Sequence, residues 1–273
     1  MLPYSQLQDG GAALRRHPGG AVTDSPRART RPDIGSAAAI RTELAELADP
    51  ERAAAMAHYF QARPGGYGEG DRFLGIAVPP QRRIARRHAA AATTADVEEL
   101  LGSPWHEERL TGLFVLVHRF ERADDDERDR IVELYLARRD RVDNWDLVDA
   151  SAPYLLGPWL LERDRADDGA LLDELAASAS VWDRRIAVMA TFAGVRAGRP
   201  EATLRLADRL LTDPADLVQK AVGWMLREVA NRDRVRAEAF LAPRYRRMPR
   251  TMLRYAIERL PADRRRDYLA GRV

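Results

Sequence analysis

The first segment that could carry chemistry is residues 144–149, which read Asn-Trp-Asp-Leu-Val-Asp. In a helix capped by Asp143, Trp145 and Asp149 lie one turn apart and opposite the apolar stripe. The pattern therefore predicts an indole and a carboxylate that face solvent. A carboxylate stabilises a positive charge that develops on a substrate, and an aromatic face attracts the same charge. The alternative for Asp149 is a structural salt bridge.

The second segment is residues 219–228, Gln-Lys-Ala-Val-Gly-Trp-Met-Leu-Arg-Glu, in which Lys220 and Arg227 flank Trp224. At helical spacing Trp224 falls at the margin of the apolar stripe, so one ring face could pack in the core and the other could meet a ligand. Core packing alone is the competing interpretation for Trp224, and an ordinary surface cation is the competing interpretation for Lys220.

The elements that must position these residues are helices. Aromatic residues make up 7% of the chain and charged residues 32%, and the bias towards Ala, Leu and Arg favours helix. Helical patterns follow one another from Ile40 onward, separated by Pro and Gly, without strand-like alternation. We expect an all-α fold, with residues 1–36 as a disordered N-terminal tail and residues 37–273 as a single domain.

The helical patterns also repeat. Arg109, Asp149, Arg185 and Lys220 open similar helical segments at separations of 40, 36 and 35 residues. A two-helix unit of about this length is typical of HEAT-like repeats, which stack into a curved solenoid. Equivalent positions then line a concave groove, which is predicted to be cationic because three of the four positions carry a positive charge.

Composition excludes several classes of function. The chain has no cysteine and its five histidines lack metal-ligand spacing, so we expect no metal and no other cofactor. No apolar run is long enough to span a bilayer and no secretory leader is present, which predicts a cytoplasmic protein without membrane association. The net charge is only +2, so any nucleic-acid footprint depends on where the charges lie.

From about Met56 through Ile257 the chain resembles the HEAT-like-repeat DNA alkylation repair glycosylases (the AlkD family). The two tryptophan segments resemble the catalytic helix and the signature of that family. Three further segments match in order: residues 56–60, Met-Ala-His-Tyr-Phe; residues 73–79, Phe-Leu-Gly-Ile-Ala-Val-Pro, followed by Arg82-Arg83; and residues 181–185, Val-Trp-Asp-Arg-Arg.

The resemblance implies a monofunctional DNA glycosylase of base excision repair. It would hydrolyse the N-glycosidic bond of cationic N3- or N7-alkylated purines, such as 3-methyladenine and 7-methylguanine, in duplex DNA without flipping the base. By the same resemblance Trp145, Asp149 and Trp224 form the catalytic group, Arg185 holds the DNA backbone, and Tyr59 lies along the groove.

The remaining cations are predicted to contact phosphates of the same duplex, and they are Arg109, Lys220, Arg227 and Arg250. The partner is double-stranded DNA that contains alkylated bases, in the cytoplasm and on the nucleoid, and no obligatory protein partner is inferred. Neighbouring arginines should keep Asp149 ionised.

Two other functions remain open. A non-catalytic HEAT-repeat binder of damaged or branched DNA would keep the cationic groove and would not need the acid. A protein-binding HEAT scaffold would have an apolar or mixed groove, against which the C-terminal arginines argue. These arginines, which could also be a solvated charged face, are Arg244, Arg246, Arg247, Arg250 and Arg254.

Overall fold

The computed structural model of the 273-residue chain describes residues 33–163 and 168–273. They form two compact units, which divide between His118 and Arg119. The prediction of an all-α fold is confirmed: within the described ranges there is no strand, and one isolated bridge joins Arg72 to Trp105. Most of the predicted tail lies outside the described residues, but Ser36, which was included in it, caps the first helix.

The first unit contains four helices and most of a fifth, whose last two residues are counted with the second unit. Local signals explain where these helices begin, since Ser36, Asp49 and Thr93 each accept a backbone hydrogen bond as an N-cap. The helices are α1 (Ala37–Ala45), α2 (Pro50–Tyr59), α3 (Val78–His88), α4 (Thr94–Leu101) and α5 (His106–Phe120).

A buried carboxylate fixes the loop between α2 and α3. Glu107, which is fully buried on α5, accepts hydrogen bonds from the backbone N–H groups of Leu74, Gly75 and Ile76 at 2.8–3.1 Å. Bonds to an ionised acceptor are the stronger class, so this contact ties the loop to α5. By contrast, α2 buries none of its own side chains.

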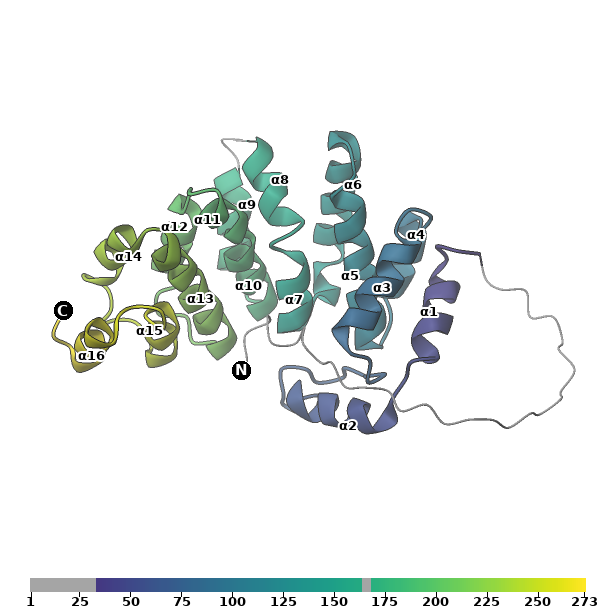
Figure 1. Cartoon of the computed structure of the whole chain (residues 1–273), viewed down its shortest axis with the longest axis horizontal. Coiled ribbons are helices and arrows are strands. Elements are labelled where there is room, and N and C mark those ends of the chain that lie inside the picture. Colours follow the sequence, from purple (N-terminus) through teal and green to yellow (C-terminus); the bar gives the residue numbers. More distant parts are fainter. Residues whose placement is uncertain (1–32, 164–167) are drawn as a thin grey trace, which may run out of the picture. The chain divides into compact units, whose positions relative to one another are not determined.

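The second unit is built from packed short helices. They are α6 (Asp125–Ala137), the 3-10 helix η2 (Arg139–Arg141), α7 (Trp145–Ser151), α8 (Leu156–Arg163), α9 (Asp168–Ala177), α10 (Val181–Ala190), α11 (Phe192–Arg196), α12 (Glu201–Arg209), α13 (Asp216–Arg232), α14 (Arg234–Leu241), α15 (Arg250–Ala256) and α16 (Ala262–Ala270). Helix α10 packs against both α7 and α13 (Figure 1). Asp149, Arg185 and Lys220 are each the fifth residue of α7, α10 and α13, which is the equivalence that the repeat pattern predicts.

The helix that carries Asp149 is shorter than the sequence pattern indicates. The pattern extends over residues 143–156, whereas α7 ends at Ser151, because Pro153 lacks a backbone N–H and its ring obstructs the preceding turn. The N-cap is Asn144 rather than Asp143, and its side-chain oxygen accepts a hydrogen bond from the Trp145 N–H at 2.8 Å.

Helices α13 and α15 approach closely at a glycine. A Cβ atom at Gly223 would lie 2.5 Å from the Met252 carbonyl oxygen and 2.6 Å from the Tyr255 Cβ atom. Both distances are shorter than van der Waals contact, and both neighbours belong to backbone or to a Cβ atom that cannot rotate away. Gly223 is therefore required for the packing that places Trp224 beside α15.

A buried arginine links three helices of the second unit. Arg185 on α10 donates from Nε to Asp149 Oδ1 at 2.9 Å and from Nη2 to Oδ2 at 2.7 Å. Its third nitrogen, Nη1, donates to the carbonyl oxygen of Leu217 on α13 at 2.5 Å. Arg185 is 3% exposed and Asp149 8% exposed, so the guanidinium and the carboxylate satisfy each other away from water.

We predict that Gly223→Ala lowers the free energy of unfolding by about 1–3 kcal/mol, because the methyl group forces α13 and α15 apart. Gly102→Ala is the matched control, since its φ of −71° suits alanine and an added Cβ there meets only ordinary contacts of 3.4 Å and longer. Denaturant unfolding of both variants checks this, and equal effects would contradict the close approach.

We also predict that Arg185→Leu lowers the free energy of unfolding by about 3–5 kcal/mol at neutral pH, because a buried carboxylate loses its partner. Burial raises the pKa of Asp149, and loss of the arginine raises it further. A carboxyl whose folded-state pKa is raised loses stability as pH rises through that value, so the variant should be less impaired at acidic pH. Unfolding at several pH values tests this.

The control for that prediction is the double variant Asp149→Leu/Arg185→Leu, in which no charge is left unpaired. It should recover much of the lost stability, since replacing both partners of a buried pair is often neutral. If Arg185→Leu destabilises the protein equally at every pH, lost packing is responsible rather than the unpaired charge of the buried Asp149.

Candidate active site

The residues predicted to face solvent on α7 are buried. Trp145 is 6% exposed and Asp149 8% exposed, so the expected exposure of both side chains is wrong. All seven residues of α7 are buried, because α10 packs on the helix and Arg185 occupies its polar side. An amphipathic pattern identifies that polar side, but it does not tell whether water or another helix covers it.

Burial also changes the electrostatics of Asp149. Burial raises the pKa of this carboxyl, while the charge and hydrogen bonds of Arg185 act in the opposite direction and the nearby Asp146 raises it further. The expectation that arginine favours the ionised form is right for Arg185, but desolvation is the larger effect. The pKa of Asp149 therefore lies above the ordinary aspartate value, and Arg185 is the partner that opposes this rise.

Sequence reasoning missed a pair of hydroxyl groups that joins the end of α7 to α6. The Ser151 hydroxyl donates to the carbonyl oxygen of Leu147 at 2.6 Å, and the Tyr135 hydroxyl oxygen lies 3.1 Å from Ser151 Oγ. Burial and the charge of Asp149 raise the pKa of Tyr135, so its phenol stays protonated and can donate to Ser151. In the sequence Tyr135 is one member of the apolar stripe of α6, and no local signal marks it as different from its aliphatic neighbours.

Trp224 lies at the margin of the apolar side of α13, as the sequence predicts. The indole is half-buried, and its Nε1–H group donates to Glu228 Oε1 at 3.3 Å. The Arg227 guanidinium lies 6.0 Å from the ring centroid and is ion-paired with Glu258. Lys220 lies 2.5 Å from the Asp216 carboxylate. This face therefore combines an accessible ring with cations that already have acidic partners.

Arg185 connects the two tryptophan helices. It joins Asp149 of α7 to the Leu217 carbonyl oxygen of α13, and Trp224 is seven residues further along α13, about 10 Å along the helix axis. The structure thus joins Asp149 to Arg185 by hydrogen bonds, with Trp145 one turn before Asp149 on α7, and places Trp224 on the helix that Arg185 contacts.

Two predicted DNA contacts lie in the first unit and differ in exposure. Tyr59, at the end of α2, is 51% exposed and packs edge-to-face on Phe60. Arg109 is 2% exposed and donates to Asp71 Oδ1 at 2.9 Å and to the Ser103 carbonyl oxygen at 3.2 Å. The expectation that Arg109 faces a phosphate is therefore corrected: it serves the interior of the first unit.

The last predicted contact, Arg250, begins α15 and is exposed. Its Nη1 atom donates to the Leu269 carbonyl oxygen of α16 at 3.1 Å, and no carboxylate of the described residues pairs with it. Its charge remains available to an anion, while its hydrogen bond holds α15 and α16 together.

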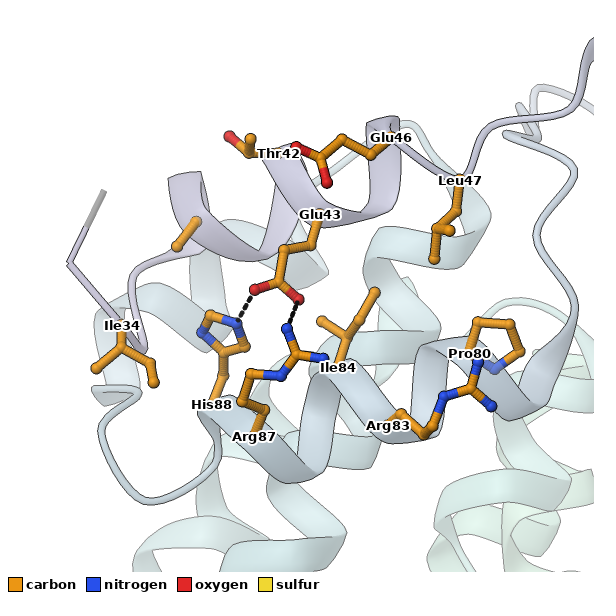
Figure 2. A pocket seen from close by; sticks show the side chains of 11 residues that line it. Ile34, Thr42, Glu43, Glu46, Leu47, Pro80, Arg83, Ile84, Arg87 and His88 are labelled. Atoms are coloured by element: carbon orange, nitrogen blue, oxygen red, sulfur yellow. Dashed lines mark hydrogen bonds and ion pairs between the residues drawn. The ribbon is translucent and has the colours of Figure 1, made fainter. Parts of the chain in front are cut away.

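A groove elsewhere in the molecule does not involve these residues. It lies between α1 and α3 of the first unit, has a volume of about 590 Å³, and includes Ile34, Leu47 and Arg83 in its lining (Figure 2). Glu43 crosses it to pair with Arg87 at 2.8 Å and His88 at 3.1 Å. Groups of His, Asp and Glu that could hold a metal ion do not occur in residues 33–163 and 168–273.

No helix within the described ranges is both long enough and apolar enough to cross a bilayer.

Comparison with known proteins identifies the family. The family model described as "DNA alkylation repair enzyme" matches residues 40–260, which include all the helices discussed above except α16 and the start of α1. Among solved structures, the chain is similar to one titled "Predicted DNA alkylation repair enzyme from Enterococcus faecalis", with a TM-score of 0.63 and 16% sequence identity, over 79% of this chain and 97% of that chain. At this identity the likeness shows the fold alone.

A search of curated proteins found no match. The family match covers well over half of the sequence and includes both tryptophan segments and the ion pair between them. The resemblance that the sequence suggested is confirmed at this level, and the chain belongs to the DNA alkylation repair enzyme family.

Proposed function

We propose that this protein is a monofunctional DNA glycosylase that hydrolyses the N-glycosidic bond of cationic N3- or N7-alkylated purines in duplex DNA. The observation that supports it most directly is the two-pronged ion pair of Asp149 with Arg185, one helical turn from Trp145. Membership of the DNA alkylation repair enzyme family supplies the substrate class, since it concerns alkylated DNA.

The proposed reaction needs little from the protein besides electrostatics. An alkylated purine already carries a positive charge, so it departs with the electrons of its bond to C1′ and becomes neutral. Positive charge then develops on the deoxyribose, where an ionised Asp149 stabilises it and orients water for attack at C1′. The water proton passes to the carboxylate or to solvent, and indole faces of Trp145 and Trp224 attract the developing cation.

Arg185 has two roles in this proposal. In the DNA-free protein it favours the ionised form of Asp149 and positions the carboxyl group, but it also closes this group off from a substrate. A backbone phosphate is an equally good two-pronged partner for guanidinium, so DNA can compete for Arg185 and free Asp149 to face the sugar. The exchange conserves the number of charged pairs, which limits its cost.

The other contacts of the proposal supply affinity rather than chemistry. Lys220, Arg227 and Arg250 contact phosphates, and the exposed Tyr59 contacts the same duplex. Because the charge develops on the sugar, the two indoles act from beside the backbone, and the damaged base is released without being flipped into a pocket. We place the activity in base excision repair on cytoplasmic, nucleoid-associated DNA.

A second candidate function is a DNA binder that does not excise bases. The burial of Asp149 and its pairing with Arg185 favour it, because a carboxylate with a purely structural role would be placed in this way. It would keep the surface cations and would hold Asp149 sealed even when DNA is bound. The two functions differ in whether a free base is produced.

We expect Asp149→Asn to lower the rate of 7-methylguanine release from methylated duplex DNA roughly 100–1,000-fold, because the stabilising charge is lost. Binding of the duplex should persist, since phosphate contacts supply the affinity. Chromatography of released bases and a mobility-shift titration measure the two effects.

The control for this variant is Asp173→Asn, which also removes a carboxylate paired with an arginine, but an exposed one, and should excise normally. Thermal unfolding must show that Asp149→Asn remains folded, and if it does not, Trp145→Phe serves as the second variant. Base release by folded Asp149→Asn at the native rate would refute the role of Asp149, and no release by the native protein would favour the binder.

We further expect the excision kcat/KM to fall on the acidic side at a pH above the ordinary aspartate pKa of 3.8. Only ionised Asp149 is active, and burial raises the pKa of this group in the free protein, whose titration kcat/KM reports. A pH series of base release with 7-methylguanine DNA tests this. A rate that stays constant down to the ordinary aspartate range would contradict the assignment.

A further inference from the structure

Positive charge is concentrated at the C-terminal end of the chain. Residues 242–273 contain ten arginines and three acidic residues, an excess of seven, whereas the whole chain has an excess of two. The remaining residues are therefore acidic in sum. An excess of one sign over so short a segment costs free energy by self-repulsion, and it attracts a polyanion.

Some of these arginines are neutralised within the protein and others are not. Arg244 pairs with Asp208, and Arg264 pairs with Glu238. Arg247 and Arg254 are exposed and pair with no carboxylate of the described residues. Arg250 is exposed and bonded only to a carbonyl oxygen. We call Arg247, Arg250 and Arg254 the C-terminal arginine row.

Arg250 and Arg254 are four residues apart in α15, so they lie on the same side of that helix. Arg247 lies in the turn that precedes the helix. The opposite side of α15 is buried through Met252, Leu253 and Ala256. Arg250 and Arg254 therefore extend from the solvent side of α15, about one helical turn apart, and Arg247 is exposed in the turn before them.

The row continues a surface that the candidate site already presents. Glu258, which follows α15, pairs with Arg227 of α13, and the close approach at Gly223 keeps the two helices together. At helical spacing Lys220, Trp224 and Arg227 lie on one side of α13. Helices α13 and α15 lie side by side within the second unit (Figure 1).

We propose that the C-terminal arginine row binds the phosphate backbone of duplex DNA next to the damaged nucleotide and supplies a large part of the salt-dependent affinity, for undamaged as well as damaged DNA. The inference rests on the proposed function only in taking duplex DNA as the partner. Arginine suits this partner because its fork donates two parallel hydrogen bonds to a phosphate. In this proposal α7 and α10 position the charge that acts on the sugar, and the C-terminal arginine row binds the DNA strand.

The test measures binding of an undamaged, fluorescently labelled duplex of about 20 base pairs as a function of salt. In Arg247→Ala/Arg254→Ala the slope of log K against log salt should decrease by about two, since each lost phosphate contact removes roughly 0.9. Arg250 is left in place because its bond to Leu269 holds α16. Thermal unfolding verifies that the variant is folded.

The matched control is Arg205→Ala/Arg236→Ala, which removes the same charge from arginines that pair with Asp173 and Glu201. Its slope should equal that of the native protein. An unchanged slope in the row variant, or the same decrease in both double variants, would overturn the proposal. Because the duplex contains no lesion, this result is independent of base release: failure to excise 7-methylguanine would leave it standing.

Discussion

The bond between Arg185 and Asp149 is the contact on which the second unit and its candidate site both depend. A carboxylate that is 8% exposed and a guanidinium that is 3% exposed each carry a large desolvation cost, which only their mutual geometry offsets. Because the third nitrogen of Arg185 bonds the Leu217 carbonyl oxygen, satisfying that cost also fixes α7, α10 and α13 relative to one another. The helices that carry Trp145 and Trp224 are therefore positioned by the same arginine that positions the acid.

This arrangement has a consequence for any chemistry at the site. The bond between Arg185 and Asp149 covers the carboxyl group, so the proposed activity would require that Arg185 bind another anion. A phosphate of the substrate is the natural replacement, since it accepts the same paired hydrogen bonds. If Asp149 became accessible only when Arg185 binds a phosphate, the carboxylate would be available only in the complex with DNA. The same coupling explains how a buried acid and a polyanionic substrate are compatible.

Ion pairing organises other parts of the molecule as well, both inside it and at its surface. In the first unit Arg109 and His106 hold Asp71, and although burial raises the pKa of that carboxyl, these partners bring it below its usual value. On α13 the cations beside Trp224 already have acidic partners. The C-terminal arginine row lacks such partners among the described residues and lies in a segment with an excess of positive charge. A protein whose net charge is only +2 can still attract DNA through arginines that lack an acidic partner.

The sequence by itself determined the helical class, the repeat equivalence of Asp149, Arg185 and Lys220, and the marginal position of Trp224. Each of these follows from local periodicity, composition or spacing along the chain. Tertiary structure alone decided that Trp145, Asp149 and Arg109 are buried, because helical periodicity identifies a polar side and cannot say what covers it. It also decided that the partner of Asp149 is one arginine 36 residues away, whose approach depends on the packing of α10 between α7 and α13.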